Sequence, residues 1–250
     1  ETLASDITVA DHLPCDPLQL GDHACASLFI EGFGFRAFRR PLDQTDVDRY
    51  LAIWELVADE DGFEDGIRWV ITAMLQSPHF LYRSELGVQR DEGRFELTPW
   101  EIASELSYAF WGTMPDDALF DAAAAGELET PHQIAEQAAR LANDPRALET
   151  VADMVETWLL LDRLDTVSRE GLTHELRAAM RAETRDLVID YAASGSTLSD
   201  LMTSTRTFVD EDLAAHYGLT GHGQIELSGT RYGGLLTQGS VLTTHALPTG

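Results

Sequence analysis

The sequence predicts an all-α protein, built as one or more multi-helix bundles with a short β-hairpin-like segment near residues 223–234. Apolar residues recur at spacings of three and four through most of the chain, which is the period of an amphipathic helix. Prolines and glycines fall at the boundaries of these periodic segments, where helices begin and end. Only residues 223–234, GQIELSGTRYGG, have strand character, with Ser228-Gly229 as the turn.

The first elements follow from this pattern. Residues 1–22 are predicted to be irregular, because Pro14, Pro17 and Gly21 interrupt any helical repeat. The next segment, DHACASLFIEGFGFRAF, has helical spacing up to Gly32 or Gly34. Residues 41–62 then place one apolar stripe on a helix, made of Val47, Tyr50, Leu51, Trp54 and Val57 or Ala58.

A third helix is predicted over residues 63–78, FEDGIRWVITAMLQSP, and Pro78 stops it. It is apolar around most of its circumference, Trp69 included, so we expect it to be central.

Capping residues in the sequence predict where the later helices begin. Thr98, Pro99 and Glu101 form a capping-box pattern, and Gly112 fits the C-terminal cap. The same device recurs at Thr130, Pro131 and Gln133, and a further helix starts from Asp144 and Pro145. A long helix is predicted from about Thr173 to Ala193, and TFVDEDLAAHYG, residues 207–218, reads as a short helix ended by Gly218.

These elements fall into three parts. Residues 1–22 form an irregular N-terminal segment, and residues 23–86 form a small helical domain. The polar stretch GVQRDEGRFE, residues 87–96, is a predicted linker to a larger helical domain, residues 97–250.

The charge excludes several classes of partner. The chain has 43 acidic and 17 basic residues, a formal net charge of -26, and every basic residue is an arginine. Binding to nucleic acid or to anionic membrane surfaces is therefore not expected. No run of 18 apolar residues is present, so no membrane span is predicted. The acidity favours solubility in a salty or extracellular setting over an acidic docking face for a basic partner.

Cys15 and Cys25 are the two cysteines, with nine residues between them. The spacing fits neither a redox CxxC nor a zinc knuckle, and no other cysteine completes a metal site. A disulfide is favoured over two free thiols, and it would indicate an oxidising compartment, periplasmic or extracellular.

Candidate site residues are few. His216 and His222 flank the turn YGLTG, either as a two-histidine metal or haem contact or, as favoured, as surface residues of a turn. His79 follows a proline beside aromatic residues, and a buried histidine bonded to backbone is favoured over a ligand. Glu183 lies one turn from Asp186, and a solvated acidic face is favoured over an acid–base pair. No metal motif, GxSxG elbow or phosphate loop is present, so the catalytic residues stay unknown and no metal site is predicted.

Long strings carry a family resemblance. FGFRAFRRPLDQTDVDRYLAIW and AMLQSPHFLYRSE, within about residues 24–86, resemble the fifth domain of the planctomycete-specific series. LTPWEIASELSYAFWGTMPDDALFDAAAAGEL, LANDPRALETVADMVETWLLLDRLD and RYGGLLTQGSVLTTHALPT, within about residues 97–245, resemble the fourth. The resemblance implies a following cytochrome-c-like domain with a CxxCH haem motif. This chain has no CxxCH, so we expect no cofactor in it and a haem c only in a C-terminal part or a partner chain.

These points predict a secreted helical scaffold or docking module of a c-type-cytochrome-associated multidomain protein that supports electron transfer. The alternative is part of an extracellular enzyme, either a haem oxidoreductase completed by a C-terminal part or a hydrolase acting on polymers. Residues 232–250 carry no carboxylate and several apolar side chains, and read as a connector toward the cytochrome-like part. We expect this segment to pack, either on the chain's own helices or against that cytochrome-like partner.

Overall fold

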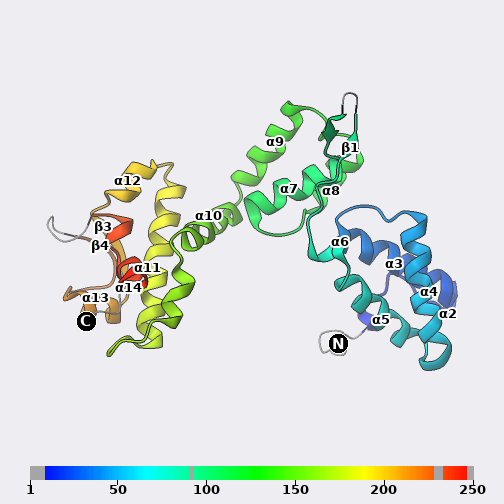
Figure 1. The fold of residues 1–250 in the computed structure, drawn as a ribbon, viewed down its shortest axis with the longest axis horizontal. Coiled ribbons are helices and arrows are strands. Elements are labelled where there is room, and N and C mark those ends of the chain that lie inside the picture. The colour runs from blue at the N-terminus through cyan, green and yellow to red at the C-terminus, as the bar shows by residue number, and fades with distance from the viewer. Residues whose placement is uncertain (1–8, 91–92, 228–232, 247–250) are drawn as a thin grey trace. The chain divides into compact units, whose positions relative to one another are not determined.

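The computed structural model describes residues 9–90, 93–227 and 233–246, and it confirms the predicted all-α class (Figure 1). The strands that it describes form two small antiparallel pairs. Contacts divide the chain into two units, Glu1–Ala139 and Arg140–Gly250, and each is described by itself. No helix among the described residues is long and apolar enough to cross a membrane.

The first unit is a succession of helices. Its elements up to residue 81 are η1 (Val9–His12), α2 (Pro17–Leu20), α3 (Asp22–Phe38), α4 (Gln44–Asp61), α5 (Phe63–Leu75) and α6 (Pro78–Leu81). They are followed by β1 (Val88–Gln89), β2 (Phe95–Glu96), α7 (Pro99–Trp111), α8 (Asp117–Ala124) and α9 (Pro131–Ala142), the last of which ends within the second unit.

Helices α3, α4 and α5 enclose the core of the first unit. Ile30, Ile67 and Met74 are completely buried there. The stripe predicted on α4 is confirmed, since Val47, Tyr50, Leu51 and Trp54 are all buried. Helix α5 is less enclosed than its composition suggests, because Trp69 is 50% exposed. Its buried residues occupy one face rather than the whole circumference.

Helix α3 does not end at Gly32 or Gly34, as the sequence suggested, but continues to Phe38. The reason is packing at Gly34, where a Cβ would lie 2.7 and 2.8 Å from the two δ-methyl carbons of Leu42. Gly34 therefore admits the Leu42 side chain instead of terminating the helix. Helix α3 ends instead at its C-cap residue Arg39, which adopts the left-handed conformation at φ 59°.

The predicted caps of this unit are confirmed. The Thr98 hydroxyl accepts from the Glu101 amide at 3.2 Å, and the Glu101 carboxylate accepts from the Thr98 amide at 2.7 Å. Thr130 and Gln133 make the same reciprocal pair before α9. In the predicted linker the structure adds the pair β1–β2, with Val88 opposite Glu96.

Cys15 and Cys25 form the predicted disulfide, with their Cα atoms 5.7 Å apart. Cys25 is fully buried in the first turns of α3. The bond therefore ties the short elements η1 and α2 to a core helix.

The second unit is built around one long helix, α11 (Figure 1). Its elements are α10 (Pro145–Trp158), η3 (Leu161–Thr166), α11 (His174–Ala193), α12 (Leu198–Met202), β3 (Arg206–Val209), α13 (Glu211–Tyr217), β4 (Gly223–Glu226), η4 (Leu235–Thr237) and α14 (Gly239–His245). The predicted starts of α10 and α11 are confirmed, since Asp144 and Thr173 cap them.

The strand predicted at residues 223–234 is present at β4, but its partner is β3, with Thr207 opposite Ile225. The predicted turn at Ser228-Gly229 lies outside the described residues. Residues 207–209, expected to open a helix, are instead in β3, and α13 begins only after its cap at Asp210. Thr207 and Val209, two residues apart on this strand, are both buried. This alternation has the two-residue period of a strand.

The carboxylate-free segment near the end of the chain packs on its own unit. Leu235, Ser240 and Val241 are buried, and α14 contacts both η3 and α11. The His245 ring lies 2.9 Å from the Leu159 carbonyl oxygen. Leu236 and Leu242 stay about half exposed, at 49% and 56%. Of the two packing modes considered from sequence, the structure shows the intramolecular one for residues 233–246.

Candidate functional site

Helix α11 carries networks of polar contacts on two of its faces. Thr173 caps the helix by accepting from the Leu176 amide at 3.2 Å, which fixes where its turns begin. Arg181 and Arg185, four residues apart, lie toward α10. Glu183 and Thr184 lie toward β3, α13 and the segment 233–246. Each face is a chemically different site.

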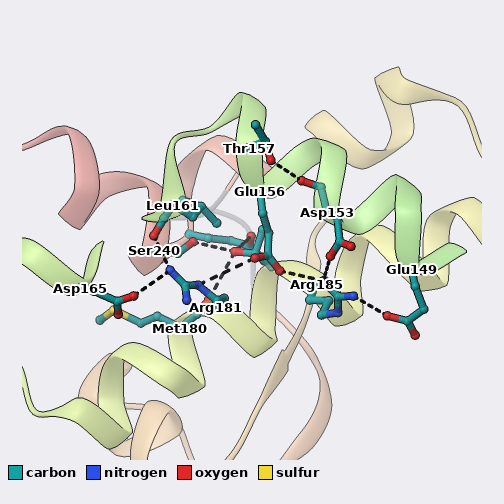
Figure 2. A network of polar contacts seen from close by, with 12 residues as sticks. Glu149, Asp153, Glu156, Thr157, Leu161, Asp165, Met180, Arg181, Arg185 and Ser240 are labelled. Atoms are coloured by element: carbon teal, nitrogen blue, oxygen red, sulfur yellow. Dashed lines mark hydrogen bonds and ion pairs between the residues drawn. The ribbon is translucent and has the colours of Figure 1, made fainter. Parts of the chain in front are cut away.

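The first face is an ion-pair cluster, shown in Figure 2. Arg185 donates to Asp153 at 2.6 Å and to Glu156 at 3.1 Å, and it also pairs with Glu149. Its pKa is raised, first by the hydrogen bond to Asp153 and then by those to Glu149 and Glu156, despite partial burial. Three carboxylates of α10 therefore converge on one guanidinium, and this clamps the two helices together.

Arg181 extends the cluster toward η3 (Figure 2). Its guanidinium donates to the Leu161 carbonyl at 2.6 Å and lies 3.4 Å from the Asp165 carboxylate. Arg181 therefore joins η3 to α11 through a hydrogen bond to a backbone carbonyl as well as through an ion pair.

The second face centres on Glu183, which is only 2% exposed. Thr207 of β3 donates to one of its carboxyl oxygens, and Tyr217 of α13 donates to the other at 2.6 Å. The Tyr217 hydroxyl in turn accepts from the Gly239 amide at 2.8 Å. Burial raises the pKa of Glu183, and the two hydroxyl donors act in the opposite direction without cancelling it.

Thr184 makes the neighbouring contact with the end of the chain. Its hydroxyl donates to the Gln238 side-chain carbonyl at 2.9 Å and lies 2.6 Å from the Ser240 hydroxyl. Thr184 and Ser240 are completely buried, and Gln238 is 5% exposed. Two successive residues of α11 thus hold the segment 233–246, one directly and one through Tyr217.

The space beside Glu183 is too small for a substrate. The cavity that its side chain lines with Thr207 and Gln238 measures about 10 Å³. A single water molecule needs about 10–15 Å³ of such space. The arrangement can hold a proton on a buried carboxyl and fix three elements to α11, but it offers no room for a reacting molecule.

The structure separates the histidines predicted as candidates from this network. His216 is exposed in the last turn of α13 and His222 is exposed before β4, which agrees with the favoured surface interpretation. His79 is half-buried in α6, where its ring packs on Phe38 at 5.4 Å. Within residues 9–90, 93–227 and 233–246, no group of three or more metal-ligating side chains gathers at one place.

Of the candidates, Glu183 alone lies in the network, and it is buried rather than on a solvated acidic face. Sequence reasoning missed the partners of Glu183, which are Thr207 and Tyr217, and those of Thr184, which are Gln238 and Ser240. They lie 24 to 56 residues from the residue of α11 that each one bonds, and no motif joins them. The one signal was the carboxylate-free segment near the end of the chain, which indicated packing without naming the contacts.

Comparison with known proteins gives two family matches. Residues 97–219 match the family model PSD4, described as a protein of unknown function (DUF1592). Residues 25–85 match PSD5, described as a protein of unknown function (DUF1595). No curated protein and no solved structure matches the chain.

Proposed function

Because the chain carries a PSD5 domain followed by a PSD4 domain, the two planctomycete-specific families named from its sequence, we propose that it is a scaffold. In this proposal it is a secreted helical docking module of a c-type-cytochrome-associated multidomain protein, and it supports electron transfer by holding the haem-bearing part. The haem c belongs to a C-terminal part or a partner chain.

The observation that carries the proposal is the anchoring of residues 233–246 on α11. A scaffold needs a firm attachment for what it holds, and here Thr184 and Tyr217 fix the segment through buried hydrogen bonds. In the domain series that the sequence resembles, a cytochrome-like part follows this segment. The Cys15–Cys25 disulfide supports an oxidising compartment, periplasmic or extracellular.

The alternative, an extracellular enzyme, receives less support from the candidate residues. Burial raises the pKa of Glu183, and a displaced pKa in a cleft is the mark of a catalytic acid. The cavity beside it, however, measures about 10 Å³, so no substrate reaches the carboxyl.

The first test is the intact mass and absorption spectrum of the protein purified from its native source. We expect covalent haem c, either in the same polypeptide or in a chain that co-purifies with it. Native material without haem in either place would remove the electron-transfer role.

A second test addresses the scaffold itself. Thr184→Val removes the hydroxyl that bonds Gln238, whereas Thr157→Val is a control at an exposed helical site. We expect Thr184→Val to weaken retention of the haem-bearing part during purification, and Thr157→Val to leave it unchanged. Equal retention in both variants would contradict the attachment role.

A further inference from the structure

A pocket of about 410 Å³ lies in the first unit, at the end of α3, beside α6 and at the start of α7. Its walls come from residues of both family matches, and sites where domains meet are common places for ligands. The side chains that matter for its chemistry are Arg39, Arg40, His79, Arg83, Trp100 and Glu101.

The lining of the pocket holds more arginines than carboxylates, although the chain is strongly acidic. Among the described residues, three of the chain's 17 arginines line it, and Glu101 is the one carboxylate in its lining. That carboxylate is already engaged, because it accepts from the amides of Leu86 at 2.8 Å, Gly87 at 3.0 Å and Thr98 at 2.7 Å. Partial burial opposes ionisation, but these hydrogen bonds prevail and lower the pKa of Glu101. Glu101 therefore stays ionised, and its single negative charge offsets only part of the charge of the three lining arginines.

Arg39 gives the pocket a buried positive charge. It is 6% exposed and donates to the carbonyl oxygens of Ala37 at 3.1 Å, His79 at 2.8 Å and Tyr82 at 3.0 Å. Among the described residues no carboxylate forms an ion pair with it. Carbonyl oxygens satisfy its donors but leave its full charge in place, and a buried charge attracts an opposite one strongly.

Arg83 and Arg40 offer donors toward solvent. The Arg83 guanidinium lies over the Tyr108 ring at 4.9 Å, and its distance of 3.7 Å from the Glu105 carboxylate is too long for a hydrogen bond. Its side chain is 46% exposed. Arg40 is 32% exposed, forms an ion pair with Asp46 at 2.9 Å, and donates to the Pro41 carbonyl at 2.9 Å. Each guanidinium has five N–H donors, so both retain free donors for a ligand.

Trp100 supplies an apolar wall. It is half-buried, with its ring edge-on to Phe35 at 5.6 Å, so its position is fixed by packing. A fixed indole is a good surface for a flat ring. We propose that the pocket binds a small carboxylate carried on a ring, with the carboxylate at Arg40 and Arg83 and the ring against Trp100. This site does not depend on the scaffold role.

The test uses the 250-residue chain and two ring carboxylates, glucuronate and benzoate, which separate a sugar source from an aromatic one. Ligand-observed NMR and calorimetry would measure binding, with glucose, benzyl alcohol and acetate as comparison compounds. We expect saturable binding of at least one ring carboxylate, and at least about tenfold weaker binding of all three comparison compounds.

Two variants locate the site. Arg83→Gln should weaken binding of the ring carboxylate about five- to tenfold, because it removes a charge-assisted contact. Arg68→Gln is the matched control, since Arg68 pairs with Glu64 and Asp65 on its own helix, outside the pocket lining, and it should change nothing. Circular dichroism of both variants checks that they fold like the parent.

Three outcomes would overturn the proposal. Neither ring carboxylate binds, or acetate or a neutral ring compound binds as tightly as they do, or Arg83→Gln folds normally and binds with the parent's affinity.

Discussion

At the scale of single residues, Glu183 links burial to protonation. Its carboxyl lies in the interior with two hydroxyl donors, and no cation is among the hydrogen-bond partners that the described part of the chain gives it. Burial penalises the ionised form and raises the pKa of Glu183 above its usual value of 4.5. Since the unfolded chain does not share this shift, the stability of the fold depends on pH through this residue.

The sign of that dependence can be tested with Glu183→Gln. Because the folded-state pKa is raised, the protonated carboxyl stabilises the fold fully below the unfolded pKa, and this stabilisation is lost as pH rises through the folded pKa. The free energy of unfolding of the parent should therefore fall relative to that of Glu183→Gln as pH rises from about 4 to about 8. Urea unfolding across this range measures it. Glu170→Gln, at an exposed site, should run parallel to the parent, and a parallel Glu183→Gln curve would show that the shift is absent.

The capping box of α7 gives a second residue-scale prediction. Thr98→Ala should lower the free energy of unfolding by about 1 kcal/mol, because it removes the cap of the Glu101 amide. Glu101→Ala should cost more, since Glu101 also holds the amides of Leu86 and Gly87. Gln133→Ala at α9 is the comparison, because the hydrogen bonds described for the Gln133 side chain go to Thr130 alone. Equal costs for Glu101→Ala and Gln133→Ala in denaturant unfolding would contradict the added role.

At the scale of elements, local sequence signals predicted the helices well but predicted the pairing of strands poorly. Caps such as Thr98 and Asp144 bond to amides within three residues, so they can be recognised directly from the sequence. Strand β3 was missed because its partner β4 lies 17 residues away, from Arg206 to Gly223, and its own four residues give little periodicity. The prediction that α3 ends at Gly34 was wrong, because the glycine is there to make room for the Leu42 side chain and the sequence does not show that contact.

The candidate site was less predictable than the fold, for the same reason. Glu183 could be named, but its burial is caused by residues of β3, α13 and the segment 233–246. Such contacts come from tertiary packing, which overrides the polar character of a side chain and leaves no local pattern.

The disulfide is a device that acts between elements. Replacing both cysteines with alanine should lower the free energy of unfolding by about 2–3 kcal/mol, because the closed loop limits the unfolded chain. Adding reductant to the parent should produce a loss of similar size, while the double variant should be insensitive to it. Unfolding midpoints that do not change on reduction would refute this estimate.

The terminal elements η4 and α14 are predicted to stabilise the second unit. Deleting residues 233–250 exposes the sites of Leu235 and Val241, each worth about 1.5–3 kcal/mol, and leaves Thr184 without its partners. The thermal midpoint of the second unit should therefore drop sharply, or the unit should fail to fold. A midpoint equal to that of the parent would contradict the packing of this segment.

A milder substitution keeps this prediction testable if the deletion does not fold. In Gly239→Ala the new Cβ would lie 2.5 Å from the Tyr217 hydroxyl, so we expect a loss of about 1–3 kcal/mol. Gly233→Ala is the matched control, because no atom of the described residues lies within 4 Å of a Cβ there. Identical melting of the two variants would argue against a close fit at Gly239.

At the scale of the whole molecule, charge is the dominant property. With 43 acidic and 17 basic residues, repulsion among carboxylates opposes the folded state. Ion-pair clusters such as Arg185 with its three carboxylates reduce this repulsion only locally.

Salt should therefore stabilise this protein. Raising sodium chloride from about 0.05 M to about 0.5 M shortens the Debye length and screens the repulsion, so the thermal midpoint should rise. Differential scanning calorimetry at neutral pH measures it, and sucrose at equal osmolality controls for solvent exclusion. A midpoint that falls with salt would mean that ion pairs outweigh the net charge.

The bonds from Thr184 to Ser240 and from Tyr217 to Gly239 also set an order of events during synthesis. A ribosome makes α11 well before it makes residues 233–246, and Thr184 and Ser240 are 56 positions apart. Until residues 233–246 leave the exit tunnel, Thr184 has no Ser240 to bond, and the Leu235 site stays open to water. The nascent second unit therefore stays incomplete, exposed to chaperones and proteases, until α14 has been synthesised and can pack on α11.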